Sequence, residues 1–130
     1  MDNQPKLGYL RVNNFFVQPD YKGQQALLDA INRNDTVLLP SMIIATVLYD
    51  DDFEFARNAC IRLCEHEGEI VRGNAILGLG HLARLFGKLG EQEIAIIKRG
   101  LHDPSDYVRG QAHAAADDLK QFLEVDVGAP

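Results

Sequence analysis

The side chains of this chain that could carry chemistry are a histidine between two carboxylates, two isolated histidines and two cysteines. Glu65-His66-Glu67 joins residue types that bind divalent cations. Consecutive residues in a turn, however, do not by themselves converge on one ion. We therefore interpret this segment as a solvated turn and predict no metal site. A metal-dependent enzyme stays open as a less favoured alternative.

The isolated histidines, His81 and His113, lie in segments with helical spacing. Neither belongs to a recognisable nucleophile motif with a serine or a cysteine. The sequence also lacks a glycine-rich loop of the GxxxxGK type that would hold a nucleotide phosphate. We predict that the protein is not an enzyme, has no catalytic residues and uses no cofactor or small-molecule substrate.

The two cysteines, Cys60 and Cys64, are four positions apart. A helix places residues with this spacing on one face, and their apolar neighbours favour burial. Side chains one helical turn apart are poorly placed for a disulfide. We expect two buried free thiols, which do not require an oxidising compartment.

An internal repeat indicates the elements that must position these side chains. Val71-Arg72-Gly73 recurs as Val108-Arg109-Gly110, an offset of 37 residues (109 − 72 = 37). The similarity extends over residues 67–83 and 104–120. A fixed period of this size is typical of stacked helical hairpins, none of which can bury its apolar face alone.

The offset also bears on the candidate chemistry. It puts Asp103 at the position of His66 (66 + 37 = 103), so the Glu-His-Glu pattern is not repeated. It puts Asp118 at the position of His81 (81 + 37 = 118), so one face is polar in both hairpins. We interpret that face as a binding surface and not as a catalytic site.

The helical spacing predicts an all-α single domain over residues 1–130. We expect a right-handed stack of three hairpins, with about six helices, behind an extended N-terminal arm. The expected segments are the arm at 1–20, a degenerate hairpin at 21–50, hairpins at 53–86 and 90–123, and a frayed tail at 124–130. Asp20 is expected to cap the first helix, the second helix to begin near Thr36, and Pro104 to stand in the first turn of the last helix.

Glycines interrupt one of the predicted helices. Gly73, Gly78 and Gly80 each cost about 1 kcal/mol relative to alanine. A helix tolerates this mainly where the backbone of a neighbour comes close. Because Gly110 repeats Gly73, we expect the close approach in both hairpins.

Composition and charge restrict the class of partner. The chain has 46% hydrophobic and 25% charged residues, as an ordinary globular protein does, and a formal net charge of −6. Nucleic acids need cationic contacts, so we predict none as a partner. An acidic surface favours basic protein partners, although it can also serve solubility alone.

The sequence has no secretion signal and no apolar run long enough for a membrane span, so we expect a cytoplasmic protein with no membrane partner.

The repeated turn acid, Val-Arg pair and alanine resemble the HEAT-repeat family. The matching residues are Glu69, Val71, Arg72, Ala75 and Leu79, and then Asp106, Val108, Arg109 and Ala112. The resemblance implies stacked hairpins and a scaffold that binds proteins, without a particular activity. It also implies a ladder of arginine–carboxylate pairs between neighbouring hairpins, in which Arg72 pairs with Asp103 or Asp106. Arg109 has no following repeat, so its partner stays open and it is freer to meet a ligand.

Acidic residues gather in the predicted turns. Stacked hairpins place such turns along one edge, where the acids would form a ridge that Asp35 extends. Carboxylates in turns also cap helix N-termini, and this second interpretation stays open. The predicted protein-binding residues are Glu65, Glu67, Glu69, Asp103, Asp106, Tyr107 and Arg109.

Together these patterns predict a non-catalytic protein-binding module with a basic protein as its partner. One specific version is a small acidic inhibitor, such as a bacterial immunity protein that neutralises a toxin nuclease by occlusion. An adaptor or chaperone-like subunit of a larger assembly is the alternative.

Overall fold

Six α-helices account for most of residues 21–128, the part of the chain that the computed structural model describes. They are α2 (Gln24–Asn32), α3 (Leu39–Tyr49), α4 (Phe53–Leu63), α5 (Glu69–Phe86), α6 (Glu91–Gly100) and α7 (Asp106–Leu123). No strand occurs within residues 21–128. The predicted all-α fold is therefore confirmed. The predicted arm at 1–20 and the Asp20 cap lie outside the described residues.

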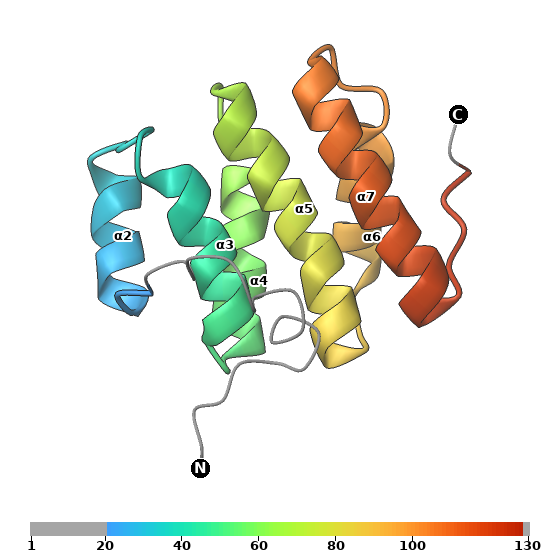
Figure 1. Ribbon diagram of the computed structural model, residues 1–130, viewed down its shortest axis with the longest axis horizontal. Coiled ribbons are helices and arrows are strands. Elements are labelled where there is room, and N and C mark those ends of the chain that lie inside the picture. The colour runs from blue at the N-terminus through green and yellow to red at the C-terminus, as the bar shows by residue number, and fades with distance from the viewer. Residues whose placement is uncertain (1–20, 129–130) are drawn as a thin grey trace, which may run out of the picture.

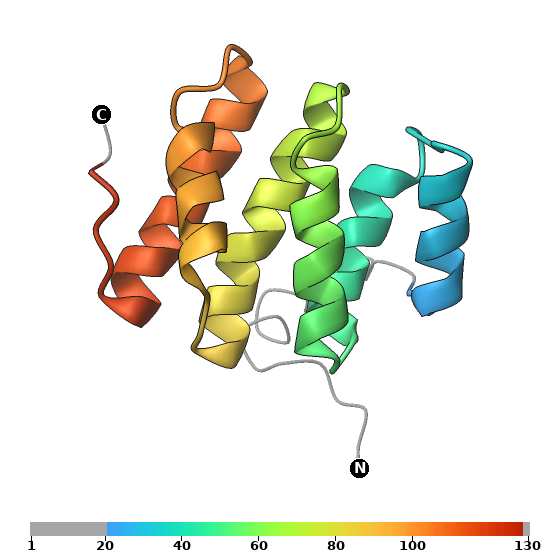
Figure 2. The ribbon, with the colours of Figure 1, turned by 180° about the vertical axis from the view of Figure 1, so that it is seen from behind.

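Consecutive helices form three hairpins, α2–α3, α4–α5 and α6–α7, which stand side by side (Figure 1). The helices α3, α5 and α7 form one layer, and Figure 2 shows α4 and α6 on its other side. The central helix α5 packs against α3, α4, α6 and α7. Its contact with α7 is the most extensive between any two of the described helices, so the stack is held together mainly between hairpins.

One apolar core passes through all three hairpins. All six helices contribute fully buried side chains to it, including Leu27, Ile43, Cys60, Leu79, Ile97 and Leu119. Each such side chain stabilises the fold by about 1.5–3 kcal/mol relative to an exposed position. Helices α3 and α5 are apolar around most of their circumference because neighbours cover them on several sides. Among the described helices, none combines the length and the apolar character needed to cross a bilayer.

Side-chain caps explain where two of the helices begin. Asp52 caps α4 by accepting a hydrogen bond from Phe55 N (3.0 Å). Ser105 caps α7 by accepting one from Val108 N (3.2 Å). Pro104 therefore lies before α7 and not in its first turn, which corrects the expected position.

The second helix begins later than the sequence suggests. The Asp35 carboxylate accepts a hydrogen bond from Leu38 N (3.1 Å), and the Asp35 carbonyl oxygen accepts one from Leu39 N (2.9 Å). These bonds hold residues 36–38 in a turn, so α3 begins at Leu39 and not near Thr36. As a result, the side chains of Val37 and Leu38 stay exposed in that turn.

Residues 124–128 pack against the stack, so the prediction of a frayed tail is wrong for this segment. Glu124 ends α7 in a left-handed conformation (φ 57°), and Val125 N donates a hydrogen bond to Leu119 O (3.1 Å). Val127 is buried and Val125 is partly buried against the core. The alternation of valines with acidic residues allows this segment to cover apolar surface while its charges face water.

Two glycines allow neighbouring helices to approach closely. A Cβ at Gly80 would lie 2.6 Å from Ala115 Cα of α7, and a Cβ at Gly73 would lie 2.8 Å from the Tyr107 ring. At Gly110, in contrast, nothing lies within 4 Å of the place a Cβ would take. The expected close approach at Gly110 is wrong, because no described helix packs on that side of α7.

Gly110→Ala should therefore stabilise the protein. The position is exposed, lies inside a helix and has room for a methyl group. Alanine is favoured over glycine in a helix, so we expect the free energy of unfolding to rise by about 0.5–1 kcal/mol. Urea denaturation and thermal melting measure the change. A loss of stability would show that this side of α7 is covered.

Candidate protein-binding edge

Each hairpin has a turn between its two helices, and the three turns lie along one edge of the stack (the top edge in Figure 1). They comprise residues 33–38, 64–68 and 101–105. We call this edge, together with the first turns of α3, α5 and α7, the turn edge. It carries all the acids of the expected ridge: Asp35, Glu65, Glu67, Glu69, Asp103 and Asp106. The structure thus brings these residues to one edge, and their role in binding stays a prediction.

Residues about one repeat apart in sequence are neighbours across the stack. The Gln111 side chain donates a hydrogen bond to Asn74 Oδ1 (3.1 Å), 37 residues away. Asn74 in turn donates to Pro40 O (3.0 Å), 34 residues away. His66 and Asn34, 32 residues apart, are also hydrogen-bonded (2.7 Å). Contacts between adjacent hairpins therefore join residues about one repeat apart, between 31 and 37 positions.

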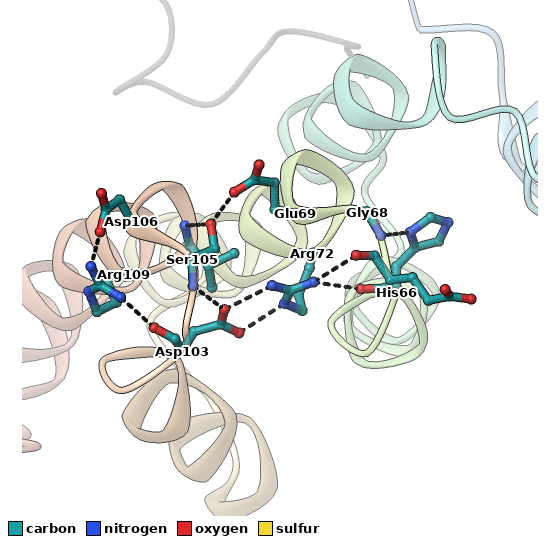
Figure 3. Close-up of polar contacts among 10 residues, drawn as sticks. His66, Gly68, Glu69, Arg72, Asp103, Ser105, Asp106 and Arg109 are labelled. Carbon is teal, nitrogen blue, oxygen red and sulfur yellow. Dashed lines mark hydrogen bonds and ion pairs between the residues drawn. The ribbon is translucent and has the colours of Figure 1, made fainter.

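Arg72 links the second hairpin to the third (Figure 3). Its guanidinium donates two hydrogen bonds to Asp103 (2.9 and 2.8 Å) and two more to the carbonyl oxygens of His66 and Glu67 (3.0 and 3.1 Å). The hydrogen bonds from Arg72 are the main reason that the pKa of Asp103 lies below its ordinary value. The expected ladder contact is therefore present, with Asp103 and not Asp106 as the partner.

His66 has the same structural role in the second hairpin as Asp103 has in the third. Each accepts a hydrogen bond from the backbone nitrogen two residues later: His66 Nδ1 from Gly68 N (2.8 Å), and Asp103 Oδ1 from Ser105 N (2.9 Å). Because Nδ1 accepts, the proton of the neutral ring is assigned to Nε2, which donates to Asn34. Both ring nitrogens are thus engaged. Within residues 21–128, no three His, Cys, Asp or Glu side chains converge where they could hold a metal ion.

Arg109, the counterpart of Arg72, turns back onto its own hairpin (Figure 3). It pairs with the Asp106 carboxylate and donates a hydrogen bond to Asp103 O (2.7 Å). Its side chain is 38% exposed, because no hairpin follows in the described chain to cover it. Arg109 is therefore accessible, as expected, but it already has partners within its own hairpin.

The uncompensated charge of the turn edge is concentrated at its centre. Asp35, Asp103 and Asp106 are each paired with an arginine. Glu69 accepts a hydrogen bond from the Ser105 hydroxyl. Glu65 and Glu67 are exposed and have no ion-pair partner among residues 21–128. The negative surplus therefore lies mainly in the turn between α4 and α5.

A hollow of about 470 Å³ lies beside this surplus. It is lined by the turns of the first two hairpins, through Asn34, Thr36, Glu65, His66, Glu67 and Gly68. Its volume is in the range of small-ligand sites, so it can admit one long side chain of a partner. A lysine or arginine that entered would meet the Glu65 and Glu67 carboxylates and form charge-assisted hydrogen bonds.

A row of exposed apolar side chains lies on the same edge, and only its Tyr107 was among the residues predicted from the sequence. It consists of Val37, Leu38, Ile70 and Tyr107, which are 84%, 44%, 43% and 36% exposed, and we call it the apolar row. Ile70 and Tyr107 are the second residues of α5 and α7, 37 positions apart, and Val37 precedes Ile70 by 33. These residues therefore occupy equivalent places along the turn edge, at or just before the starts of α3, α5 and α7. Two adjacent apolar residues at the start of a helix, as in Ile70-Val71, could have indicated an exposed apolar side chain, because only one of the two can face the core.

A hydrogen-bond network supports the apolar row from beneath. The Tyr107 hydroxyl donates to Asn74 and accepts from Gln111 (3.0 Å), while Asn74 reaches Pro40 O on α3. The Tyr107 ring also lies against Gly73. These contacts connect the first turns of α3 and α7 with the second turn of α5, close to the apolar row.

The polar face expected on α5 and α7 is largely a junction between these two helices. His81 Nδ1 accepts a hydrogen bond from Arg84 (3.2 Å) and lies 3.8 Å from Asp118 Oδ2. The side chains of His81 and Asp118 are only 22% and 19% exposed. Burial, and then the charge of Arg84, lower the pKa of His81 to about 4. Burial raises the pKa of Asp118. His81 is therefore a neutral packing residue at neutral pH.

We expect the His81 ring to stay neutral until the pH falls to about 4. The unfolded chain takes up this proton near the ordinary pKa of 6.5, so the unfolded state binds more protons between these values. His81 should therefore lower the stability of the fold as the pH falls from about 6.5 to 4. NMR of the imidazole signals measures the titration of His81, and denaturation at several pH values measures its effect on stability. The variant His81→Asn should lack this contribution to the pH dependence. A ring that titrates near 6.5 would contradict the burial.

Cys60 and Cys64 are buried free thiols, as predicted. Burial raises the pKa of both, that of Cys64 to about 11. Both are therefore protonated at neutral pH and unsuited to nucleophilic chemistry. Cys60 serves packing instead: its Sγ lies 2.9 Å from the place a Cβ at Gly78 would take.

A second hollow, of about 430 Å³, is lined by the start of α4 and the turn between α5 and α6. Phe53 and Leu89 are its main apolar side chains. Arg57 pairs with the buried Glu93 (3.0 Å), and Lys88 lies 4.6 Å from the centre of the Phe53 ring. This hollow combines cations with anions, whereas the hollow beside Glu65 and Glu67 is lined by no lysine or arginine.

Comparison with known proteins adds no relative. No family model matches the chain, and no match is found among curated proteins or solved structures. The resemblance to HEAT repeats therefore rests on the residues quoted above and stays a prediction.

Proposed function

We propose that this protein is a non-catalytic protein-binding module that recognises a basic protein through its turn edge. The observation that carries the proposal is the pair of exposed carboxylates Glu65 and Glu67, which have no ion-pair partner within residues 21–128 and lie beside a hollow, on an edge whose aspartates are paired. A cationic partner would give the central turn the pairing that its neighbours already have. Charge-assisted contacts of this kind contribute to both affinity and specificity.

The rigidity of the central turn supports this proposal. Arg72 holds the carbonyl oxygens of His66 and Glu67, and the His66 ring holds Gly68 N. The backbone that carries the two glutamates is therefore fixed before any partner arrives. Little conformational entropy is lost there on binding, which favours affinity.

The specific version that we favour is a small inhibitor built on HEAT-like hairpins, comparable to an immunity protein that blocks a toxin nuclease. The net charge of −6 would speed the encounter with a basic enzyme, and the turn edge would then occlude it. An adaptor or chaperone-like subunit is the alternative. The two are distinguished by the partner's activity, which an inhibitor abolishes and an adaptor leaves intact.

A metal-dependent activity at Glu65-His66-Glu67 is the candidate that we favour least. His66 uses Nδ1 for Gly68 N and Nε2 for Asn34, so a metal would have to displace one of these bonds. Elemental analysis of the purified chain tests this candidate. Less than about a tenth of an ion per chain would remove it.

The test of the proposed function is capture of the partner from the source organism with the full chain, followed by titration of the isolated partner at several salt concentrations. We expect a basic protein whose affinity falls steeply with salt. Glu65→Lys combined with Glu67→Lys should lower the association rate constant about tenfold or more. An acidic partner, or an affinity that does not depend on salt, would contradict the proposal.

A matched control separates local recognition from overall charge. Glu91→Lys combined with Asp117→Lys changes the net charge equally, at exposed acids outside the turn edge. We expect a small effect on association from this pair. Equal effects from the two variants would show that the turn edge is not the recognised surface.

A further inference from the structure

We infer that the turn edge binds an amphipathic basic helix of its partner. The apolar side chains of that helix lie on the apolar row, and its lysine or arginine side chains reach Glu65 and Glu67. This inference deepens the proposed function and rests on it, because it names the element of the basic protein that is recognised. A separate observation carries it, namely the apolar row.

The exposed apolar side chains are concentrated in one place. Of the five large apolar side chains that are most exposed within residues 21–128, four form the apolar row, and only Phe122 lies elsewhere. Scattered apolar residues are normal on a protein surface, whereas an apolar group with a polar rim is typical of an interaction site. Covering Val37 and Ile70 would contribute hydrophobic free energy that contacts between charges alone lack.

Acids border the apolar row; Asp106 is paired with Arg109, whereas Glu67 and Glu69 have no ion-pair partner within residues 21–128. Glu69 precedes Ile70, Asp106 precedes Tyr107, and Glu67 lies in the turn just before α5. A matching partner is therefore apolar along its centre and cationic along its flanks. A second copy of this chain does not match, because it would bring the same carboxylates and another charge of −6 to the contact.

A helix fits this edge better than an extended segment does. An extended peptide needs backbone partners, and the described residues contain no strand whose edge it could join. Backbone nitrogens of the three turns are also engaged already, by the side chains of Asp35, His66 and Asp103. A helix satisfies its own backbone and needs only side-chain contacts from the surface that it binds.

The spacing of the apolar row sets the spacing of the partner's side chains. Packed helices lie about 8–10 Å apart, so members of the row on α5 and α7 are separated by about that distance. A helix rises about 1.5 Å per residue, so side chains about five to seven residues apart cover this distance. Apolar residues at heptad spacing would therefore meet Val37, Ile70 and Tyr107 in turn.

Two synthetic peptides and the full chain test the inference. The first peptide is a helix of about three heptads with one leucine per heptad on one face and lysines on both flanks. The second has the same composition, with its leucines distributed around the helix. By fluorescence anisotropy at several salt concentrations, we expect the first peptide to bind about tenfold more tightly than the second. Val37→Ser combined with Ile70→Ser should remove that difference, and both positions are exposed, so the fold should be retained.

The outcomes separate this inference from the proposed function. Equal binding of the two peptides, with both weakened by the Glu65→Lys and Glu67→Lys changes, would overturn the helix inference and leave the basic-partner function standing. Binding of neither peptide at low salt would count against both. Sedimentation equilibrium adds an outcome: a dimer that the Val37 and Ile70 changes dissociate would assign the apolar row to a second copy and overturn the inference.

Discussion

Replacing Arg72 by methionine should lower the free energy of unfolding by about 2–3 kcal/mol, since removal of one partner of a largely buried charge pair leaves the other unsatisfied. The side chains of Arg72 and Asp103 are only 18% and 14% exposed. Without the guanidinium, Asp103 keeps the hydrogen bond from Ser105 N, and two carbonyl oxygens of the central turn lose their donor. Urea denaturation of the wild type and the variant measures the loss.

Arg109→Met is the matched control, because Arg109 occupies the same position one repeat later without a hairpin beyond it. Its partner Asp106 is 94% exposed, so we expect a loss of only about 0.5–1 kcal/mol. If both variants lost the same free energy of unfolding, the contact between hairpins would contribute no more to stability than the pair within one hairpin. A turn edge loosened by the Arg72 change should also bind its partner less tightly.

The pH dependence of the free energy of unfolding gives a second measure of how much the Arg72–Asp103 pair stabilises the fold. The pKa of Asp103 lies below its ordinary value of 3.8, so this carboxylate stabilises the fold above that value. That contribution is lost as the pH falls below 3.8 and through the folded pKa. In Arg72→Met this part of the acid sensitivity should be reduced, and an unchanged acid transition would contradict the pairing.

Gly80→Ala should destabilise the protein by about 2–3 kcal/mol, although alanine is the better helix former by about 1 kcal/mol. The added Cβ would lie 2.6 Å from Ala115 Cα and 2.8 Å from Ala115 Cβ. A backbone atom cannot rotate away as a side chain can, so α5 and α7 must separate along their extensive contact. Thermal melting and urea denaturation measure the cost.

Two variants test whether that cost comes from the helix contact. Gly110→Ala makes the same chemical change where nothing lies within 4 Å, and it should stabilise the protein. Adding Ala115→Gly to Gly80→Ala should restore stability only in part, because the contact with the Cα of residue 115 remains. If Gly80→Ala were as stable as the wild type, the close approach of α5 and α7 would be wrong.

Much of the fold could be predicted from local patterns. The helices at 69–86 and in the region ending near 123 follow from apolar spacing and from glycine at helix ends, such as Gly87 with its φ of 69°. The 37-residue offset predicted that equivalent positions stack, and Asn74 with Gln111 shows such a contact. The Arg72 pair was anticipated from the family resemblance, with its partner left open between two aspartates.

The candidate site was predicted only in part, because several of its properties depend on side-chain orientation and on contacts between hairpins. The sequence analysis grouped six acids, and the structure pairs three of them with arginines. It read His66 as a solvated turn residue, whereas both ring nitrogens are engaged. It predicted contact for Tyr107 but missed Val37 and Ile70, whose exposure depends on how the first turns of α3 and α5 are oriented.

By itself, the sequence determined the helical hairpins, their number and the edge on which their turns lie, because hydrophobic period and repeat length act over short distances along the chain. Only the tertiary structure decided that Arg72 pairs with Asp103, which glycines are crowded by a neighbouring helix and which apolar side chains stay in water. Gly73 and Gly110 stand in the same local sequence, yet one faces Tyr107 and the other faces open space. The physical reason is that these properties belong to the neighbour across the stack, and identical segments acquire different neighbours at its centre and at its end.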